Sequence, residues 1–198
     1  MNRKKDEKSY IEKILKESSE LILNSNFLIS DIIRCVDIIT HSLKKGNKII
    51  LFGNGGSAAD AQHIAAEFIG RFNIERKSLP AIALTTDSSI LTSISNDYSF
   101  DTVFSRQCES LVSKGDVVIG ISTSGNSKNV LNALKICKKR GAKTIGLLGN
   151  KGGTIIKFVD YSLTVNSKST PRIQEVHRVV SHLICDLVEK NIEGKNGK

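Results

Sequence analysis

Residues 48–58 read KIILFGNGGSA, in which a run of apolar side chains is followed by a glycine-rich turn and an alanine-rich stretch. A short apolar run bounded by turn residues is typical of a buried strand, and the alanine-rich residues 58–68 favour a helix. The segment is therefore predicted to form a strand, a turn and a helix. This is the unit from which parallel sheets are built.

The same unit recurs through the rest of the chain. Further apolar runs lie at residues 80–84, 116–121, 144–148 and 161–165. Helical periodicity lies at residues 104–112, at 130–139 and from residue 170 onwards. Because the strands are continuous apolar runs and do not alternate with polar residues, we expect helices on both faces of the sheet. The sequence predicts an α/β fold with a parallel five-stranded sheet.

Two helices are expected before the sheet. Apolar residues recur at helical spacing over residues 10–43, with a break at 24–26. They occupy more than one side of each helix, so we expect these helices to be used in oligomerisation as well as in the core. The chain is predicted to be a single domain over residues 1–198. Its parts are an N-terminal helical segment at 8–45, an α/β core at 46–192 and a flexible tail at 193–198.

Two helix starts carry recognisable capping patterns. Ser9 and Glu12 have the spacing of a capping box. Thr170 stands before Pro171, which is the order expected of an N-cap followed by proline at the first helical position.

The composition excludes several classes of protein. Hydrophobic residues make up 39% and charged residues 25% of the 198 residues, so global disorder is excluded. No apolar stretch of about 18 residues occurs, and no apolar core of a signal peptide follows the basic start. We therefore expect a cytoplasmic protein. The cysteines lack the spacing of a metal pair and are expected to be buried free thiols: Cys35, Cys108, Cys137 and Cys185.

The net charge of +9 comes from cations that are scattered along the chain. They are not interleaved with the aromatic residues that stack on bases. Solvated faces explain this pattern best, and attraction of a phosphorylated metabolite is the next explanation. We expect no nucleic-acid partner and no membrane partner.

The glycine-rich turn after the first strand has several interpretations. Residues 53–58 formally match the dinucleotide fingerprint G-x-G-x-x-A, and Asp87 follows the next strand, where a ribose-binding acid would lie. The physical requirement is only close backbone approach to an anion at a helix N-terminus, so a sugar phosphate would fit equally well. A tight turn without a ligand remains an alternative.

A second loop, residues 122–127 with the sequence STSGNS, also lies at the carboxyl end of a strand. It offers the hydroxyls of Ser122, Thr123, Ser124 and Ser127 immediately before a helix. Hydroxyls together with free backbone N–H groups bind phosphate. The alternative is a simple N-cap, but a cap requires one such residue and not four.

Two helices carry groups that could perform chemistry. His63 and Glu67 are four residues apart, so both project from one helix face as metal ligands or as an acid/base pair. On the last helix, Gln174, Arg178 and His182 form a stripe, while His177 falls between this stripe and the apolar side. The rise from Gln174 to His182 is about 12 Å. One metal ion would meet both only if their side chains lean together or come from different subunits.

Taken together, these motifs resemble those of the phosphoheptose isomerases, a family with the sugar isomerase (SIS) fold. The resemblance runs from about Tyr10 to Lys190, and it rests on residues 53–63, 96–97, 104–107, 120–127 and 172–177. The one departure is Pro171, where alanine is common in the family. Proline suits a helix start, so this departure puts little in doubt.

The resemblance implies a function and a set of site residues. Members are homotetramers with active sites at subunit interfaces. They convert D-sedoheptulose 7-phosphate to D-glycero-D-manno-heptose 7-phosphate through an enediol, the first step of heptose biosynthesis for lipopolysaccharide or capsule. The implied acid/base pair is Glu67 and His182. The implied zinc ligands are His63, Glu67, Gln174 and His182. The implied substrate contacts are Asn54, Gly55, Gly56, Ser57, Glu67, Asn96, Asp97, Ser122, Thr123, Ser124, Ser127 and Gln174.

Three other functions remain as alternatives. Proteins of the same fold bind the bacterial replication initiator, but they lack an acid at the position of Glu67. A phosphosugar-sensing module would need the phosphate loops but not Glu67. A dinucleotide oxidoreductase would not require the hydroxyls of residues 122–127. The presence of Glu67, His63 and His182 together favours an enzyme.

Overall fold

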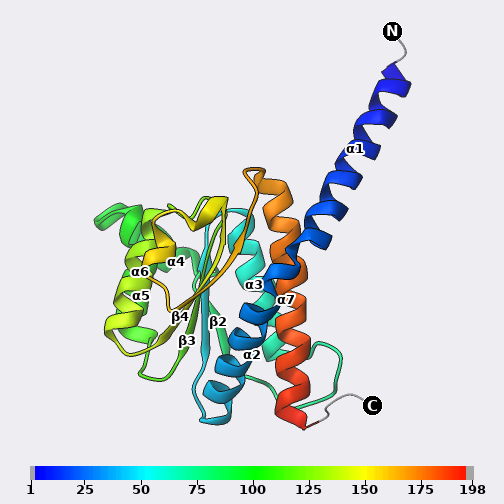
Figure 1. The fold of residues 1–198 in the computed structure, drawn as a ribbon. Helices are drawn as coiled ribbons and strands as arrows, with labels where there is room; N and C mark the ends of the chain where they lie inside the picture. The colour runs from blue at the N-terminus through cyan, green and yellow to red at the C-terminus, as the bar shows by residue number, and fades with distance from the viewer. Residues whose placement is uncertain (1–2, 195–198) are drawn as a thin grey trace.

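The sheet at the centre of the protein has the strand order β2-β1-β3-β4-β5, with every neighbouring pair parallel. It is described by a computed structural model that covers residues 3–194 (Figure 1). The strands are β1 (Ile49–Gly53), β2 (Ala81–Ala83), β3 (Val117–Ser122), β4 (Lys143–Gly149) and β5 (Tyr161–Val165). The five predicted strands and the parallel sheet are confirmed.

Helices cover both faces of this sheet, as expected for continuous apolar strands. One face carries α2 (Ile29–Lys44), α3 (Gly56–Ile69) and α7 (Thr170–Glu193). The other carries α5 (Val103–Leu111) and α6 (Lys128–Lys139). Within β1, Ile49 and Leu51 pack into the first layer, whereas Ile50 and Phe52 pack into the second. This is the alternation that a strand imposes on its side chains.

The first helix, α1 (Arg3–Leu23), projects away from this body (Figure 1). It has no buried residue, and Tyr10 and Leu15 are 65% and 64% exposed. A 3-10 turn, η1 (Asn24–Leu28), joins it to α2, which confirms the predicted break at 24–26. The expected role of these helices in oligomerisation stays a prediction.

Two helix starts and one helix differ from the sequence-based expectation. The capping box at Ser9 is wrong, because α1 already begins at Arg3, where the charged residues pair at helical spacing. The N-cap of α7 is Ser169, one residue before the predicted Thr170, with proline in the first turn. A helix that was not predicted, α4 (Ser88–Asp97), follows β2, and Asp87 caps it by accepting a hydrogen bond from the Ile90 N–H at 2.9 Å.

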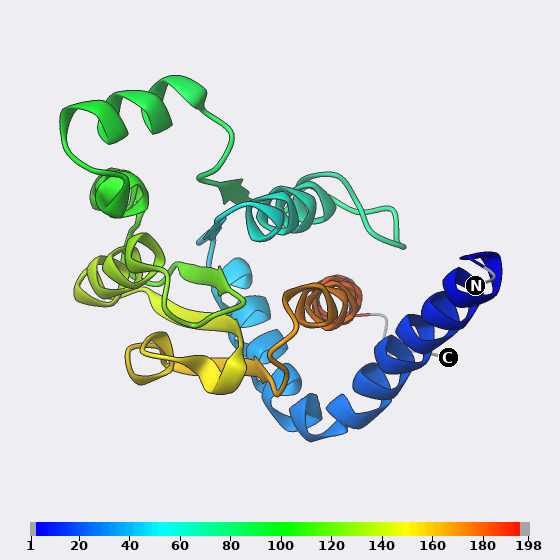
Figure 2. The same cartoon turned by 90° about the horizontal axis from the view of Figure 1, so that it is seen from above.

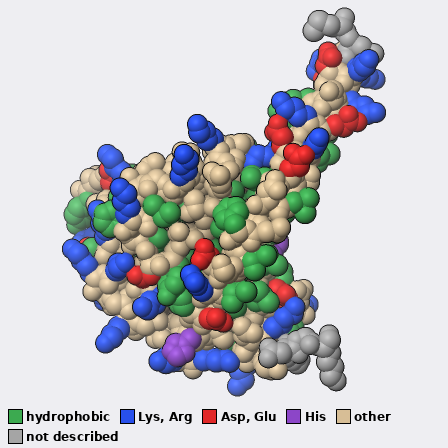
Figure 3. Space-filling model, in the orientation of Figure 1, with side chains coloured by type: hydrophobic (Ala, Val, Ile, Leu, Met, Phe, Trp, Pro, Cys, Tyr) green, Lys and Arg blue, Asp and Glu red, His purple; other side chains and the backbone are tan. Residues whose placement is uncertain are grey.

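The structure also bears on the expectations for the cysteines, the charged side chains and the C-terminal tail. All four cysteines are buried and free. On the face shown in Figure 3, Lys and Arg side chains are scattered among acidic and polar ones. Within residues 3–194, no helix is both long enough and apolar enough to cross a membrane. Of the predicted tail at 193–198, only Glu193 and Gly194 are described, at the end of α7, and the remainder lies outside the described residues.

Candidate active site

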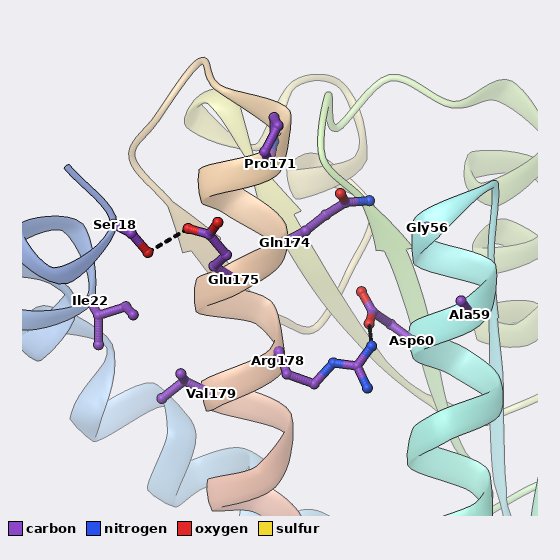
Figure 4. A pocket seen from close by; sticks show the side chains of 10 residues that line it. All are labelled: Ser18, Ile22, Gly56, Ala59, Asp60, Pro171, Gln174, Glu175, Arg178 and Val179. Carbon is purple, nitrogen blue, oxygen red and sulfur yellow. Dashed lines mark hydrogen bonds and ion pairs between the residues drawn. The ribbon is translucent and has the colours of Figure 1, made fainter. Parts of the chain in front are cut away.

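Two helices that start at the same edge of the sheet build the centre of the site. Helix α3 begins after β1, and α7 begins after β5, so both start at the carboxyl ends of parallel strands and run side by side (Figures 1 and 4). Facing residues on the two helices form three successive contacts. Gly56 meets Gln174, Asp60 meets Arg178, and His63 meets His182. The spacing of about four residues is one helical turn on each helix.

The third contact brings together a cluster of three side chains, which we call the trio: His63, Glu67 and His182. The Nε2 atoms of the two histidines lie 2.9 Å apart, and His63 Nε2 lies 3.3 Å from Glu67 Oε1. One ligand atom from each of the three residues lies within 4.8 Å of the others. All three residues are half-buried, and the Phe72 ring packs against His182 with its centroid 5.5 Å away.

The surroundings of His63 favour its neutral form. Burial lowers the pKa of His63, and the nearby Arg178 cation lowers it further, against the opposing effect of Glu67. A neutral imidazole has a free lone pair, which either accepts a proton or binds a metal ion. Two ring nitrogens at hydrogen-bond distance must share a proton or a cation between them.

Gln174, the fourth implied ligand, lies two helical turns earlier on α7 than His182. Its amide occupies the space where a β-carbon of Gly56 would be, so a larger residue there would require the Gln174 side chain to move. A cavity of about 640 Å³ lies here between α1, α3 and α7. Figure 4 shows Gln174, Asp60 and Arg178 projecting towards it.

The last residue of β3 and the loop that follows it, residues 122–127, form what we call the cradle. Ser122 Oγ lies 3.0 Å from Ser127 Oγ and 3.4 Å from Ser124 Oγ, so three hydroxyls converge. Ser127 is the N-cap residue of α6, but its side chain makes no capping hydrogen bond. The simple N-cap interpretation therefore fails for Ser127. The hydroxyls instead lie together at the start of α6, and a helix N-terminus with nearby hydroxyls can bind a tetrahedral anion.

The glycine-rich turn after β1 lies next to the cradle. The side-chain amides of Asn54 and Asn129 exchange two hydrogen bonds of 2.9 Å, which tie this turn to the first turn of α6. Ser57 is buried in the first turn of α3. The carboxylate of Asp87, considered above as a ribose ligand, is used as the cap of α4. This use removes the main support for the dinucleotide interpretation.

Two further predicted substrate contacts, Asn96 and Asp97, belong neither to α3 and α7 nor to the cradle. They end α4, are exposed, and share a hydrogen bond of 2.8 Å. Figure 2 shows α4 beside α5, away from α7. Thr123 belongs to the cradle loop, between Ser122 and Ser124.

Sequence reasoning missed several residues that support the site. Residues 150–155 brace the cradle from outside, where Asn126 Oδ1 accepts hydrogen bonds of 2.9 Å from the Thr154 N–H and hydroxyl. The adjacent Gly152 and Gly153 were the available signal. Asp60, which pairs with Arg178, carried no signal of its own, since one aspartate on a helix has many explanations.

A known protein family matches most of the chain. The SIS domain family model matches residues 9–149. The chain is 60% identical over 156 residues to the phosphoheptose isomerase of Geobacter sulfurreducens, covering 79% of this chain and 82% of that protein. It is 50% identical over 191 residues to that of Clostridium acetobutylicum, covering 95% and 97% of the two chains.

Solved structures agree as well. The phosphoheptose isomerase of Neisseria gonorrhoeae superposes with a TM-score of 0.88 at 41% identity, covering 92% of this chain and 98% of that one. The phosphoheptose isomerase of Francisella tularensis gives a TM-score of 0.88 at 32% identity, covering 96% and 100%. The chain therefore belongs to the phosphoheptose isomerase family of SIS domain proteins, and it is an isomerase.

Proposed function

We propose that the protein interconverts D-sedoheptulose 7-phosphate and D-glycero-D-manno-heptose 7-phosphate, as the first step of heptose biosynthesis for lipopolysaccharide or capsule. The observation that carries this proposal is the trio, which places a carboxylate and two imidazoles within 4.8 Å of one another. The family relationship supplies the substrate.

The reaction needs two kinds of proton transfer. A base removes a proton from C1 of the ketose and later returns a proton to C2, with an enediol between the two steps. An oxygen-bound proton moves from the C1 hydroxyl to the C2 oxygen. We assign the carbon-bound proton to Glu67 and the oxygen-bound proton to His182, since a carboxylate and an imidazole suit these roles.

The cradle and the trio suit the two ends of this substrate. The phosphate and the reacting carbons lie at opposite ends of a seven-carbon chain. The cradle lies near the start of α3, at Gly56. His63 lies about 10 Å further along this helix. We infer that the hydroxyls of Ser122, Ser124 and Ser127 bind the phosphate, while the polar groups beside Gln174 face the middle of the sugar.

The trio also has the donor set of a catalytic zinc site. Two histidine nitrogens and one glutamate oxygen are ligands that catalytic zinc commonly uses. The neutral form of His63 fits, because a metal ligand must be unprotonated. His63, Glu67 and His182 would hold the ion, with Gln174 as the fourth implied ligand. A bound zinc ion supplies Lewis acidity that stabilises negative charge on the enediol oxygens.

We further propose a homotetramer with active sites at subunit interfaces. Two observations support this assembly. Tyr10, Ile11, Leu15 and Leu23 of α1 are exposed in the single chain, and α4, which ends in Asn96 and Asp97, lies away from α7 (Figure 2). A neighbouring subunit would cover the exposed apolar side chains of α1, and assembly would bring Asn96 and Asp97 to an active site.

The decisive experiment incubates the purified full chain with D-sedoheptulose 7-phosphate and follows the sugar by NMR. An aldoheptose phosphate signal is expected, and in D₂O one deuterium should appear at C2 of the product. Binding of the sugar phosphate without conversion and without deuterium uptake would instead indicate a non-enzymatic phosphosugar-binding protein. No binding at all would contradict both functions.

A further inference from the structure

One ion pair is fully enclosed by the protein and lies beside the trio. The side chains of Arg76 and Glu189 are each 1% exposed, and Arg76 Nε lies 2.9 Å from Glu189 Oε1. Burying two charges is costly unless every polar atom finds a partner. The remaining hydrogen bonds of this pair therefore show which parts of the chain it holds together.

Arg76 binds the carboxyl end of α3. Its Nη2 donates to the carbonyl oxygen of Glu67 at 2.8 Å, and its Nη1 donates to the carbonyl oxygens of Phe68 at 2.9 Å and Lys77 at 3.0 Å. The last carbonyls of a helix have no partner within the helix, so the guanidinium supplies one. The backbone of Glu67, whose carboxylate belongs to the trio, is thus directly held by Arg76.

Glu189 binds the loop that follows α3. Its carboxylate oxygens accept hydrogen bonds from the N–H groups of Phe72 at 2.9 Å, Asn73 at 2.7 Å and Ile74 at 2.8 Å. Burial raises the pKa of Glu189, but these N–H groups and Arg76 outweigh it, so the net pKa lies below the ordinary value. The carboxylate is therefore charged at neutral pH.

The same residues connect to His182. Glu189 lies about two turns after His182 on α7, so both side chains face the same side. Phe72, whose N–H binds Glu189, packs its ring against His182. The trio consequently lies between two ion pairs: Asp60–Arg178 joins α3 to α7, and Arg76–Glu189 joins the loop after α3 to α7.

We propose that Arg76 and Glu189 are positioning residues for the trio, which fix the carboxyl end of α3 and the following loop against α7 and so set the separation of Glu67 from His182. This inference rests on the proposed function only for its catalytic consequence. The placement of the histidines is a separate claim with a separate readout.

The test compares Arg76→Lys with a matched control. Lysine keeps the charge but cannot donate to all of these oxygens at once, because an ammonium lacks the planar fork of a guanidinium. The control is Asp116→Asn. Asp116 is also buried, with a side chain 2% exposed, pairs with Lys48 at 2.8 Å, and accepts a bond from the Ser113 N–H. It lies at the amino edge of the sheet, where β3 starts.

Both variants are expected to lower the melting temperature. Arg76→Lys is expected to lower kcat about tenfold or more with little change in KM, because a displaced acid/base pair impairs the chemical step and leaves phosphate binding intact. Asp116→Asn is expected to keep kcat within about twofold. In long-range ¹H–¹⁵N NMR spectra of the metal-free chain, the ring signals of His63 and His182 should move in Arg76→Lys and stay in place in Asp116→Asn.

If Arg76→Lys loses as much stability as the control but keeps both kcat and the histidine ring signals, the pair is structural only and the inference is overturned. If Arg76→Lys does not fold, Glu189→Gln, which keeps the size of the side chain, is measured in its place against the same criteria. If the unaltered chain shows no isomerisation, the proposed function fails, and the histidine spectra alone decide the positioning claim.

Discussion

The cradle and the trio both belong to the candidate active site, yet they are built in opposite ways. The cradle comes from six consecutive residues, 122–127, and its hydroxyls converge because one loop turns into α6. The trio joins side chains from two helices, and His63 and His182 are 119 positions apart. A binding site for a simple anion can thus be formed locally, whereas an acid/base site depends on how two helices are held together.

The largest effect expected from this difference is on the chemical step. Glu67→Gln keeps the size and hydrogen bonding of the side chain but removes its ability to accept a proton. We expect kcat to fall by about 10²- to 10⁴-fold, with KM changed little and the melting temperature preserved. Steady-state kinetics with D-sedoheptulose 7-phosphate measure this. Glu75→Gln, an exposed glutamate in the next loop, should leave kcat unchanged. Near-normal turnover in Glu67→Gln would remove Glu67 from the mechanism.

The second effect concerns the stability of the contact between α7 and the sheet, which supports both the cradle and the trio. His177 is fully buried on α7, and its Nε2–H donates to the Leu148 carbonyl, 2.9 Å away. Leu148 is the register partner of Ser122 at the edge that carries the cradle. Burial lowers the pKa of His177 to about 4, from 6.5. The unfolded chain therefore binds more protons between these values, and the free energy of unfolding falls as the pH is lowered from 6.5 towards 4.

The magnitude of this loss is on the order of 3 kcal/mol. Urea unfolding at pH 7 and at pH 4.5 should detect most of it. His177→Gln, which keeps a donor for Leu148 but does not titrate, should flatten the dependence, whereas His41→Gln, at an exposed position on α2, should not. An unchanged slope in His177→Gln would show that other groups cause the acid sensitivity.

A smaller effect is expected in the cradle. Ser124→Ala with Ser127→Ala removes two hydroxyls that we propose bind the phosphate, which is remote from the reacting carbons. We expect KM to rise about tenfold and kcat to change much less. Ser110→Ala, at an exposed position on α5, serves as the control. A loss confined to kcat would place these hydroxyls at the reacting centre. The cradle would then take part in the chemical step and not only in binding.

The smallest effect expected is a shift in melting temperature on adding zinc. At about a tenfold excess over Kd, a ligand of the folded state stabilises by about 1.4 kcal/mol, or a few degrees for a chain of this size. His63→Ala should abolish the shift, since His63 belongs to the trio. His177→Ala should keep it, measured against its own metal-free value. If His177→Ala abolishes the shift and His182→Ala does not, the assignment of the second histidine is wrong.

The same distinction between local and long-range contacts explains which parts of the fold and the site could be predicted from the sequence. The strands and the cradle were predictable because continuous apolar runs and a hydroxyl-rich loop express their structure within a few residues. Helix α4 was missed because its serine, threonine and asparagine side chains favour turns as readily as helix.

The trio was only partly predictable. The spacing of His63 and Glu67 predicts a shared helix face, and the family resemblance supplies His182. The register of α7 against α3 is set by Asp60–Arg178 and by Arg76–Glu189, and nothing in the spacing of these four residues predicts that they pair. The sequence therefore left open whether His182 reaches His63 within one chain, and in the structure it does.

The close approach of the cradle to its outer brace limits how this chain can evolve. Gly125 has a φ of +67°, and a β-carbon there would overlap the backbone of Gly152 and Gly153. At Gly153, in turn, a β-carbon would meet the backbone of Gly125. Because backbone meets backbone, a mutation on one side has no compensating mutation on the other. In a library of random variants selected for activity, Gly125 and Gly153 should stay unchanged, while the exposed residues of α6 should tolerate substitution.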